Sequence, residues 1–418
     1  MTTSRTFDVL VLGGGMVGVS TALHLQAKGR AVALIDRRGL AEETSYGNAG
    51  LIQIEGVVPY PFPRDLKKIL TYALNGTSEA NVHYSALPRI APWLWKYYRA
   101  STPEGMARTA AGAKPIVTAA LREHEALMGP AGILGMLRRT GYLRVYRDGQ
   151  KLEAAIAKEK ADRDAYGVNF EVKDAAAVKA MEPHLSETFA GAIFMPDPVS
   201  VGDPGGVGKA YGALFEKQGG AVLRGEARTL EETADGWRVA TERGDVSARE
   251  VVVCLGPWSD DVVRKFGFRV PLGVKRGYHM HYSAHGNATL ARSVLDTDNG
   301  YVLAPMTMGF RITTGAEFGL REAPKTPVQL EKVEPHARRM FPLKDRLEAE
   351  PWLGRRPCLP DMLPAIGPVP GKRGLWCNFG HHHLGFTLGP ATGRLVSEMM
   401  TGGQTFVDPA PYRPDRFA

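Results

Sequence analysis

The sequence predicts a fold of the α/β plus α+β class, in which a Rossmann-like nucleotide-binding domain is joined to a second domain built on an antiparallel sheet. Three observations predict it. Residues 7–36 have the order strand, glycine-rich turn, helix and strand. Residues 250–256 form a very apolar run that ends at a glycine, which is typical of a buried parallel strand. Residues 272–282 and 300–317 alternate polar and apolar side chains, as antiparallel strands do.

The first turn carries glycines at three positions, and each meets a steric need of dinucleotide binding. Gly13 allows the tight turn, Gly15 lets the backbone approach a pyrophosphate, and Gly18 lets the following helix pack closely on the sheet. That helix begins at Met16 and Val17, where free amide groups and the positive end of the helix dipole favour a phosphate group. These five residues are therefore predicted to bind the pyrophosphate of a dinucleotide.

The second strand ends at Asp36, whose carboxylate can accept hydrogen bonds from ribose hydroxyl groups. An acidic residue at this position favours a free 2′-hydroxyl group and so disfavours NADP. Arg37 and Arg38 follow directly and can reach a 2′-phosphate, so NADP is not excluded. We predict that Asp36 and Arg37 bind the nucleotide.

A loop rich in small residues follows this strand and is predicted to enter the binding site. It contains Ser45, Asn48, Ala49 and Gly50, and its short side chains leave the backbone free to touch a flat ring. Gly256 ends the apolar strand and is predicted to meet the cofactor as well, because ligands bind at the carboxyl ends of parallel strands.

The chain has 418 residues, of which 44% are hydrophobic, and this fits a globular protein of two or three domains. No run of about 18 apolar residues is present, and the first strand begins at once, so we expect a soluble or peripheral protein of the cytoplasm. The three cysteines lack a C-x-x-C spacing. They argue against a disulfide framework and against a structural zinc site.

The net charge of +8 is spread along the chain without a run of five Lys or Arg residues, which argues against nucleic-acid binding. Residues 87–101 place Trp93 and Tyr97 on one helical face. A helix packed in the second domain is the favoured interpretation, and a surface that dips into a membrane is the alternative. Peripheral contact with the inner face of the cytoplasmic membrane therefore stays open, as does the oligomeric state.

The domains are predicted to be discontinuous. The three prolines of residues 57–64 cannot continue a sheet or a helix, so we expect the chain to leave the first domain there. Helices are expected over residues 113–128 and 149–166 with a strand over 141–146 between them, and a helix capped by Asp203 returns to the first domain. The predicted nucleotide-binding domain comprises residues 1–58, 200–262 and 355–418, and the second domain comprises residues 59–199 and 263–354.

Seven segments form a pattern that extends from the first strand to the last helix: VLGGGMVG, ETSYGNAG, PWLWKYYRAS, VGDPGG, VVVCLGPWS, WLGRRPCLPDMLPAIGP and GHHHLGFTLGPATGRLVSEMM. Together they resemble the FAD-dependent amine and D-amino acid oxidoreductases, a group that includes D-amino acid dehydrogenase, glycine oxidase and sarcosine oxidase. PWLWKYYRAS and the LPD sequence look most like bacterial D-amino acid dehydrogenases. RGYH and the GHHH segment are more similar to the branch that acts on D-proline-type imino acids, including 4-hydroxy-D-proline.

The resemblance implies FAD in place of NAD, and an FAD-binding domain assembled from three pieces of chain beside a large antiparallel sheet. It implies oxidative deamination, in which a hydride passes from Cα of a D-amino acid or cyclic D-imino acid to flavin N5 and leaves an imine. The electrons would pass to a quinone or a protein acceptor. Two alternatives stay open: an oxidase of the glycine or sarcosine type that uses oxygen, and a non-catalytic flavoprotein subunit or NAD-binding scaffold.

By the family motif GRRP, Arg356 is expected to bind the substrate carboxylate, because a guanidinium fork binds both oxygens. Its neighbour Arg355 is expected to make a surface or inter-domain ion pair.

In the alternating strand KRGYHMHY, Tyr278 shares a face with Arg276, while His279 and His281 share the other face. If Tyr278 faces the pocket, its phenol caps the carboxylate and the two histidines lie outside. A metal site at His279 and His281 is disfavoured because no carboxylate or cysteine completes it, and no metal is predicted.

Three consecutive histidines precede the last helix, and flanking glycines favour a loop beside the isoalloxazine over a zinc site. His382 or His383 is expected near the substrate, and His381 is expected to pack inside the fold. Backbone amides at the start of the helix are expected to stabilise negative charge on the flavin N1/C2 carbonyl. The predicted FAD-binding residues there are Gly385, Phe386 and Thr387.

Three further residues have a less specific signal. Cys358 raises the alternative of covalent flavin attachment, but its spacing to the following Pro-Asp differs from that of relatives, so a plain buried thiol is favoured. Tyr301 and Arg311 are second-rank candidates for the site. We expect Tyr301 to serve sheet packing and Arg311 to form a structural ion pair.

Overall fold

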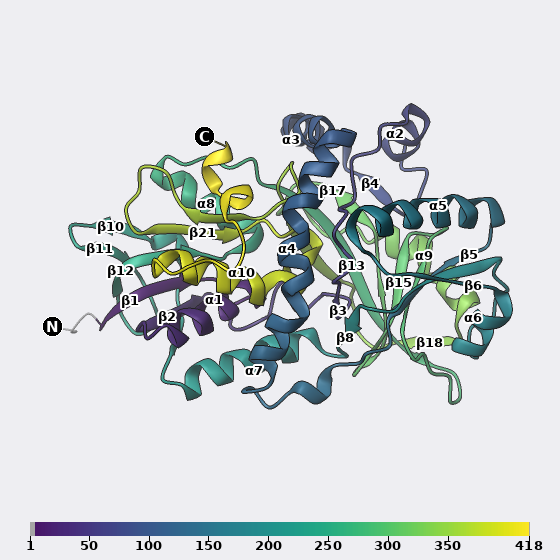
Figure 1. Ribbon diagram of the computed structural model, residues 1–418, viewed down its shortest axis with the longest axis horizontal. Coiled ribbons are helices and arrows are strands. Elements are labelled where there is room, and N and C mark those ends of the chain that lie inside the picture. The colour runs from purple at the N-terminus through teal and green to yellow at the C-terminus, as the bar shows by residue number, and fades with distance from the viewer. Residues whose placement is uncertain (1–4, 418) are drawn as a thin grey trace.

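Two large sheets lie side by side in the structure, a computed structural model that describes residues 5–417 (Figure 1). An eight-stranded sheet lies on the left in this view, and an eleven-stranded sheet lies on the right. A short ribbon of β3 (Leu51–Ile52) and β8 (Val199–Ser200) lies between them. The predicted combination of an α/β fold with a second, strand-rich part is confirmed.

The first sheet has a parallel centre, in which β12, β1, β2 and β9 are neighbours and β21 pairs with β12. These strands are apolar and buried, because helices or irregular chain cover both faces. The predicted unit over residues 7–36 is confirmed as β1, α1 and β2. The strands are β1 (Arg5–Leu12), β2 (Val32–Asp36), β9 (Ala221–Arg224), β10 (Glu231–Thr233), β11 (Gly236–Val239), β12 (Val246–Val253), β20 (Ala365–Pro368) and β21 (Leu375–Phe379).

Three helices from distant parts of the chain share the core on one face of this sheet: α1 (Met16–Ala27), α7 (Pro204–Lys217) and α10 (Gly385–Met400). Asp203 caps α7 as predicted, because its side chain accepts a hydrogen bond from the Gly206 amide at 2.8 Å. The long helix α4 (Pro103–Met128) packs on α10 and begins well before residue 113, where the sequence pattern placed its start. The smaller helix α8 (Ser259–Val263) lies on the opposite face.

The second sheet is mostly antiparallel and has one face covered and one face turned toward the first sheet. Helix α9 (Val328–Met340) and helix α6 (Ala175–Met181) contribute to the core on the covered face. The strands predicted over 141–146, 272–282 and 300–317 are present as β5, β13, β15 and β16. The strands of this sheet are β4 (Ala80–Val82), β5 (Tyr142–Tyr146), β6 (Glu171–Lys173), β7 (Gly191–Met195), β13 (Gly273–Ala284), β14 (Ser293–Asp296), β15 (Tyr301–Met306), β16 (Gly309–Thr313), β17 (Ala316–Phe318), β18 (Leu343–Arg346) and β19 (Trp352–Cys358).

The last predicted domain boundary falls inside β19. Arg355 and Arg356 pair with Arg276 and Lys275 of β13, so both arginines belong to the second sheet. If the domains are divided according to the two sheets, this boundary lies after Cys358, where β19 ends. The other predicted boundaries stay a proposal.

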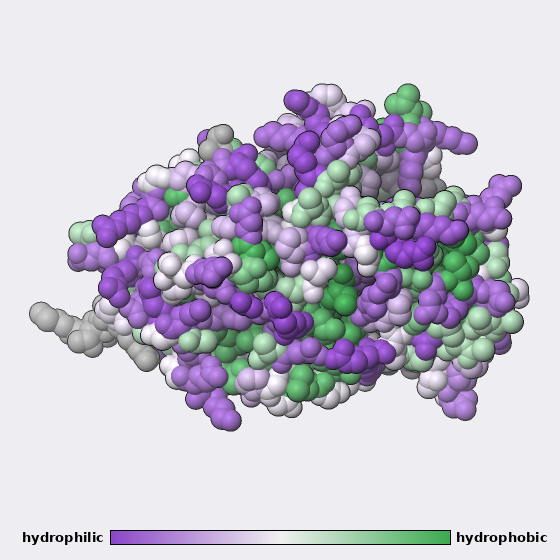
Figure 2. All heavy atoms as spheres, in the orientation of Figure 1, coloured by the Kyte–Doolittle hydropathy of each residue, from purple (hydrophilic) through white to green (hydrophobic). Residues whose placement is uncertain are grey.

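Three helices complete the second half: α2 (Leu66–Ala73), α3 (Leu87–Ala100) and α5 (Gly149–Tyr166). Helices α2 and α3 project together from the upper end of the molecule in Figure 1. Most of the face in Figure 2 carries hydrophilic residues, as expected from a dispersed charge. Among the described residues, no helix has both the length and the apolar composition needed to cross a membrane.

Candidate active site

A cavity of about 1270 Å³ lies between the two sheets. Its wall runs from the glycine turn at Gly13, past the loop at Asn48, to Arg356 and His383 on the far side. The residues that line this cavity come from all three predicted regions of the cofactor site. These regions are the first turn, the small-residue loop and the start of α10.

The glycine turn is packed so closely that side chains would not fit. Gly13 has a φ of +109°, and a Cβ atom there would lie 2.5 Å from the Cys254 carbonyl oxygen. A Cβ atom on Gly18 would overlap the Gly13 carbonyl oxygen, so α1 can approach β1 only with glycine here. Gly15 faces Ser45, with 3.2 Å between the position of its absent Cβ and the Ser45 Oγ. This cradle fits the pyrophosphate of FAD.

The polar groups around this turn also hold its shape. The Met16 amide was expected to be free, but it donates a hydrogen bond to Ser45 Oγ at 2.9 Å. Asp36 accepts from the amides of Gly14 at 2.8 Å and Arg38 at 2.7 Å and lines the cavity. The Arg37 guanidinium lies 4.8 Å from the ring centre of Trp258. Contact of Asp36 and Arg37 with a nucleotide stays a prediction.

The small-residue loop is fixed between the two sheets. Asn48 Oδ1 accepts from the Gly50 amide at 2.8 Å, and Gly50 has a φ of +75°. Arg311 Nη1 donates to the backbone carbonyls of Tyr46, at 3.1 Å, and of Asn48. Ala49 lies in the cavity wall. The loop therefore reaches the cavity as predicted, and Arg311 of the second sheet holds it there.

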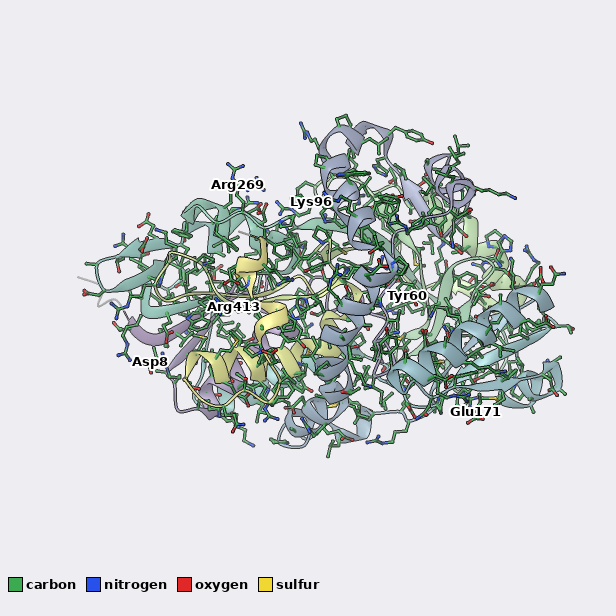
Figure 3. All side chains as sticks on the ribbon, turned by 45° about the horizontal axis from the view of Figure 1, so that its top comes forward. Asp8, Tyr60, Lys96, Glu171, Arg269 and Arg413 are labelled. Atoms are coloured by element: carbon green, nitrogen blue, oxygen red, sulfur yellow. The ribbon has the colours of Figure 1, made fainter. Side chains whose placement is uncertain are left out.

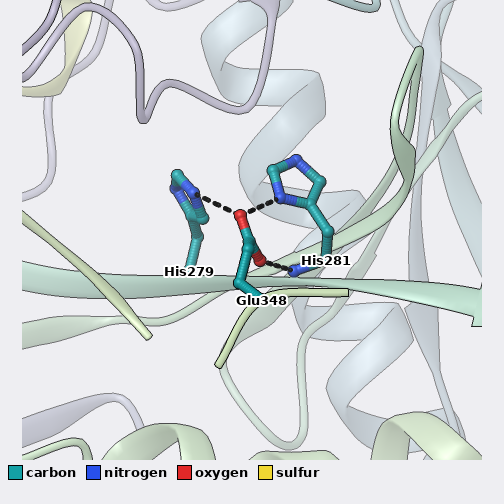
Figure 4. Close-up of side chains that lie close together, drawn as sticks. All are labelled: His279, His281 and Glu348. Carbon is teal, nitrogen blue, oxygen red and sulfur yellow. Dashed lines mark hydrogen bonds and ion pairs between the residues drawn. The ribbon is translucent and has the colours of Figure 1, made fainter. Parts of the chain in front are cut away.

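Arg311 is the first member of a buried chain of polar groups. Its Nε donates to His281 Nε2 at 2.9 Å, and His281 Nδ1 lies 2.6 Å from Glu348 Oε1 (Figure 4). Glu348 Oε2 also accepts from the His281 amide at 2.8 Å. Arg311 was expected to form a structural ion pair, but its partners are carbonyl groups and an imidazole, so that expectation is wrong.

The same cluster corrects the expectation about a metal site. A carboxylate, Glu348, does lie beside His279 and His281, and ligand atoms of the three residues lie within 4.8 Å of one another (Figure 4). Burial and the positive charge of Arg311 lower the pKa of both imidazoles, that of His279 to about 2. A cation would meet the Arg311 guanidinium at the same place, so the cluster is better suited to hydrogen bonding than to metal binding.

Tyr278 does not face the cavity with its hydroxyl group, and this corrects the predicted cap on the carboxylate. The hydroxyl lies 3.0 Å from Glu317 Oε1 and accepts from the Thr326 amide at 2.8 Å. Tyr278 and Arg276 point to the covered side of the sheet, where Arg276 Nε forms an ion pair with Glu317 at 2.8 Å. Side chains alternate along a strand, so the neighbouring Gly277 faces the cavity side.

Arg356 lies on that cavity side and is half-buried. Gly277 leaves the space for it, because a Cβ atom there would lie 2.7 Å from Arg356 Nη2. Arg356 Nη1 donates to the Gly315 carbonyl at 2.9 Å, and Nη2 donates to the Thr314 carbonyl at 3.2 Å. Burial lowers the pKa of Arg356. No carboxylate is paired with this guanidinium among residues 5–417, so an unpaired positive charge faces the cavity.

Arg355 points the other way, as alternation along β19 requires. Its Nε donates to the Arg321 carbonyl at 2.8 Å, and its guanidinium lies 5.8 Å from the Trp258 ring centre. The expected ion pair is therefore replaced by a carbonyl and an aromatic ring.

Lys275 is a cavity residue that the sequence analysis missed. It lies opposite Arg356 on the paired strand, and its Nζ lies 2.8 Å from the Tyr97 hydroxyl. Burial and the nearby Arg356 charge lower the pKa of Lys275 to about 8. A lysine at the start of a strand is usually interpreted as a surface residue, and only the pairing of β13 with β19 shows that Lys275 lies in the cavity wall.

The three consecutive histidines have three different environments. His381 is buried and lies 2.9 Å from Thr392 Oγ1, so it packs inside the fold. His382 has a φ of +54°, and its Nε2 accepts from the Leu359 amide at 3.2 Å. His383 lines the cavity with its ring centre 5.4 Å from that of Tyr60. Burial, with the charges of Arg356 and Lys275, lowers the pKa of His383 to about 3, so this imidazole is neutral.

The start of α10 meets the cavity but is also tied to its surroundings. Thr387 Oγ1 donates to the Leu51 carbonyl at 3.2 Å and accepts from the Gln53 amide at 3.1 Å. The Phe386 carbonyl lies 2.9 Å from His124 Nε2. Gly385 and Phe386 line the cavity, as does Gly256, which follows β12 and has a φ of +54°. Val17 and Gly15 line it from α1 and the first turn.

Glu55 is a second cavity residue that the sequence analysis missed. Its Oε1 accepts from Gln53 Nε2 at 3.2 Å, and its Oε2 has no hydrogen-bond partner among the described residues. Burial raises the pKa of Glu55 to about 7. No motif marks this residue, since it follows a strand of only two residues. Cys358, in contrast, is a buried thiol whose pKa burial raises.

Comparison with known proteins gives a consistent result along the whole chain. Residues 8–399 match the family model described as FAD dependent oxidoreductase. A D-amino acid dehydrogenase of Paramagnetospirillum magneticum is 31% identical over 98% of both chains. A D-amino-acid oxidase of Bradyrhizobium diazoefficiens is 28% identical over 98% of both chains.

Solved structures show the same fold at lower sequence identity. Glycine oxidase from Geobacillus kaustophilus superposes with a TM-score of 0.74 at 20% identity, covering 99% of this chain and 100% of that chain. Iminodiacetate oxidase from Chelativorans sp. BNC1 superposes with a TM-score of 0.72 at 21% identity, covering 97% and 99%.

Proposed function

The chain belongs to the family of FAD-dependent oxidoreductases, and from this premise we propose that it oxidises D-amino acids or cyclic D-imino acids to imines. The names of its relatives, D-amino acid dehydrogenase and D-amino-acid oxidase, support this substrate class. The electrons pass to a quinone or a protein, because most of the named relatives are dehydrogenases. Contact with the inner face of the cytoplasmic membrane fits such an acceptor.

The single observation that carries the proposal is the Arg356 guanidinium in the cavity wall. It lies half-buried in the cavity wall, and no carboxylate is paired with it among residues 5–417. A buried cation is costly without a counter-ion, and a guanidinium fork matches the two oxygens of a carboxylate. We therefore assign Arg356 to the carboxylate of an amino or imino acid.

FAD is the cofactor, and the residues around the cavity fit it. The glycine cradle at Gly13 and Gly15 would hold the pyrophosphate, Asp36 the ribose, and the loop at Asn48 and the start of α10 at Gly385 the ring system. When bound, FAD supplies the acceptor for the hydride that leaves Cα.

The side chains near Arg356 prepare the substrate for this reaction. The positive charges of Arg356 and Lys275 lower the pKa of a substrate amine beside them, which favours the neutral amine that the oxidation needs. The neutral imidazole of His383 can accept a hydrogen bond from the amine. The aromatic rings of Tyr60 and Tyr97 bound the same part of the cavity. Tyr60, labelled in Figure 3, lies beside α4 between the two halves of the molecule.

The experiment is a substrate panel scored by loss of the visible flavin absorption without oxygen. It compares D-amino acids, D-proline, 4-hydroxy-D-proline, glycine and sarcosine with the corresponding L-enantiomers. Bleaching by D-enantiomers alone supports the proposal, and bleaching by L-enantiomers alone contradicts it. Admission of air afterwards tests the acceptor, since reoxidation within seconds would identify an oxygen-using oxidase.

A further inference from the structure

Large apolar side chains are exposed in one short part of the chain. Of the eleven large hydrophobic residues exposed among residues 5–417, six lie between residues 60 and 95. Most soluble proteins scatter such residues singly, and a cluster marks an interaction surface. The six are Tyr60, which lines the cavity beside His383 and precedes α2, and Leu66, Leu70, Leu74, Tyr84 and Trp95.

Helix α2 presents a leucine stripe outward. Leu66, Leu70 and Leu74 follow one another at intervals of four residues, so they lie on one face, and their exposed fractions are 75%, 61% and 74%. The other face, with Ile69 and Tyr72, lines the cavity. No residue of α2 is buried, so the helix places its leucines in the solvent rather than in a core.

Helix α3 and the short helix η1 (Tyr84–Ala86) extend this apolar surface. Trp95 is 60% exposed, and its ring stacks on Tyr98 with 5.7 Å between centres. Tyr84 is 56% exposed, and its hydroxyl donates to the Ala73 carbonyl at 2.8 Å, which ties η1 to α2. Figure 1 shows α2 and α3 projecting from the same end of the molecule, and Figure 2 shows apolar side chains at the tip over α2.

Positive charges surround the apolar residues. Residues 60–100 contain six Lys or Arg residues and two acidic residues, and all six basic residues are exposed. The two acids are occupied within the fold, since Asp65 caps α2 and Glu79 binds the Tyr72 hydroxyl. The basic residues are Arg64, Lys67, Lys68, Arg89, Lys96 and Arg99.

We infer that α2, η1 and α3 form a docking surface for an anionic lipid bilayer. Leucine, tryptophan and tyrosine are the side chains that enter a membrane interface, and exposed lysine and arginine beside them meet lipid phosphates. A protein partner or a second copy of this chain would match the leucines but does not require the exposed basic residues. Among the described residues, only Lys68 of these six has an ion-pair partner, Glu79 at 3.9 Å. The combination of both therefore selects a lipid surface.

Docking through this surface would turn one end of the cavity toward the bilayer. Arg64, Ile69 and Tyr84 of the docking surface and Leu94 of α3 also line the cavity, so the cavity reaches the space between α2 and α3. On a bilayer this end of the cavity faces the lipid, from which a lipophilic quinone can enter. The quinone route rests on the proposed function, whereas lipid binding does not.

The test is cosedimentation of the purified FAD-loaded protein with vesicles. We expect binding to vesicles of phosphatidylcholine mixed with phosphatidylglycerol, and little binding to phosphatidylcholine alone. Replacing Leu66, Leu70 and Leu74 by serine should reduce the bound fraction about tenfold. Leu134→Ser with Leu347→Ser is the matched control, because both leucines are exposed elsewhere and should leave binding unchanged. Quenching of Trp fluorescence by brominated lipid should disappear in Trp95→Phe.

Several outcomes would overturn the inference. They are absence of wild-type binding to the anionic vesicles, equal binding by the serine variant, and equal loss in the control. A wild-type dimer that becomes a monomer in the serine variant, measured without lipid, would assign the surface to a second copy instead. Turnover with a water-soluble dye acceptor should be the same in both variants. If the wild type shows no turnover with the dye, the proposed reaction is contradicted, but the vesicle-binding result still tests the docking surface.

Discussion

Lys275 on β13 and Arg356 on β19 lie directly opposite each other in an antiparallel pair, so two cations project from the same wall of the cavity. Like charges directly opposite each other destabilise a sheet. No carboxylate is paired with either side chain within residues 5–417. We therefore propose that the substrate carboxylate binds beside this pair of cations, where its negative charge would offset their repulsion.

Lys275→Met should weaken the binding of an inert carboxylate such as acetate about tenfold or more, because one of the two cations is lost. Lys275→Arg should retain most of the affinity. The groups that face Lys275 are Arg356, Cys358, Tyr97 and the histidines at 382 and 383.

The pH dependence of this binding separates Lys275 from a purely structural role. The pKa of Lys275 is lowered to about 8 in the free protein, so the lysine is charged below that pH and loses its charge above it. Wild-type affinity for acetate, measured by calorimetry, should fall as the pH rises through about 8. The fall should be absent in Lys275→Arg, whose guanidinium keeps its charge. An identical pH profile in the two proteins would remove Lys275 from the carboxylate site.

Glu55→Gln should stabilise the protein at alkaline pH. The pKa of Glu55 is raised to about 7 in the folded protein from 4.5, so its neutral form is favoured in the fold. Wild-type stability from this group is complete below pH 4.5 and is lost as the pH rises through 7. The variant should therefore be more stable than the wild type by about 1 to 3 kcal/mol at pH 8, and equal to it near pH 4. Denaturant unfolding at the two pH values measures this, and an equal difference at both would contradict it.

Arg311→Met should weaken FAD binding. Arg311 donates to the Tyr46 and Asn48 carbonyls, and it links the cofactor loop to the second sheet. Loss of these charge-assisted hydrogen bonds should raise the FAD dissociation constant about tenfold or more. Titration of the apoprotein with FAD, followed by flavin fluorescence, measures the change. The exposed Arg346→Met serves as control, and equal affinity in the two variants would show that the loop does not depend on Arg311.

The first half of the fold could be predicted from the sequence because its signals are local. Gly13, Gly15 and Gly18 meet steric needs within one turn. The strands near them are apolar along their whole length, which is typical of a parallel sheet buried on both faces. Arg356 was also predicted correctly as a residue of the cavity, but by family resemblance, since its burial depends on a strand pair that the sequence does not show.

The wrong predictions concern residues whose surroundings depend on contacts between segments far apart in the sequence. Alternation showed that Arg276 and Tyr278 share a face, but only the contacts of α9 and β19 decide which face meets the cavity. Glu348 lies 67 residues beyond His281, so the carboxylate that completes the cluster had no local signal. Lys275 was missed for the same reason.

We propose that Arg356 holds the carboxylate of a D-amino or D-imino acid for oxidation. The most direct measurement is the rate of anaerobic flavin bleaching by the best D-substrate of the panel, in the wild type and in Arg356→Ala. We expect rapid bleaching in the wild type. In the variant, which should still bind FAD, we expect a loss of about 3 to 5 kcal/mol in transition-state stabilisation. Equal bleaching rates in the two proteins would contradict it.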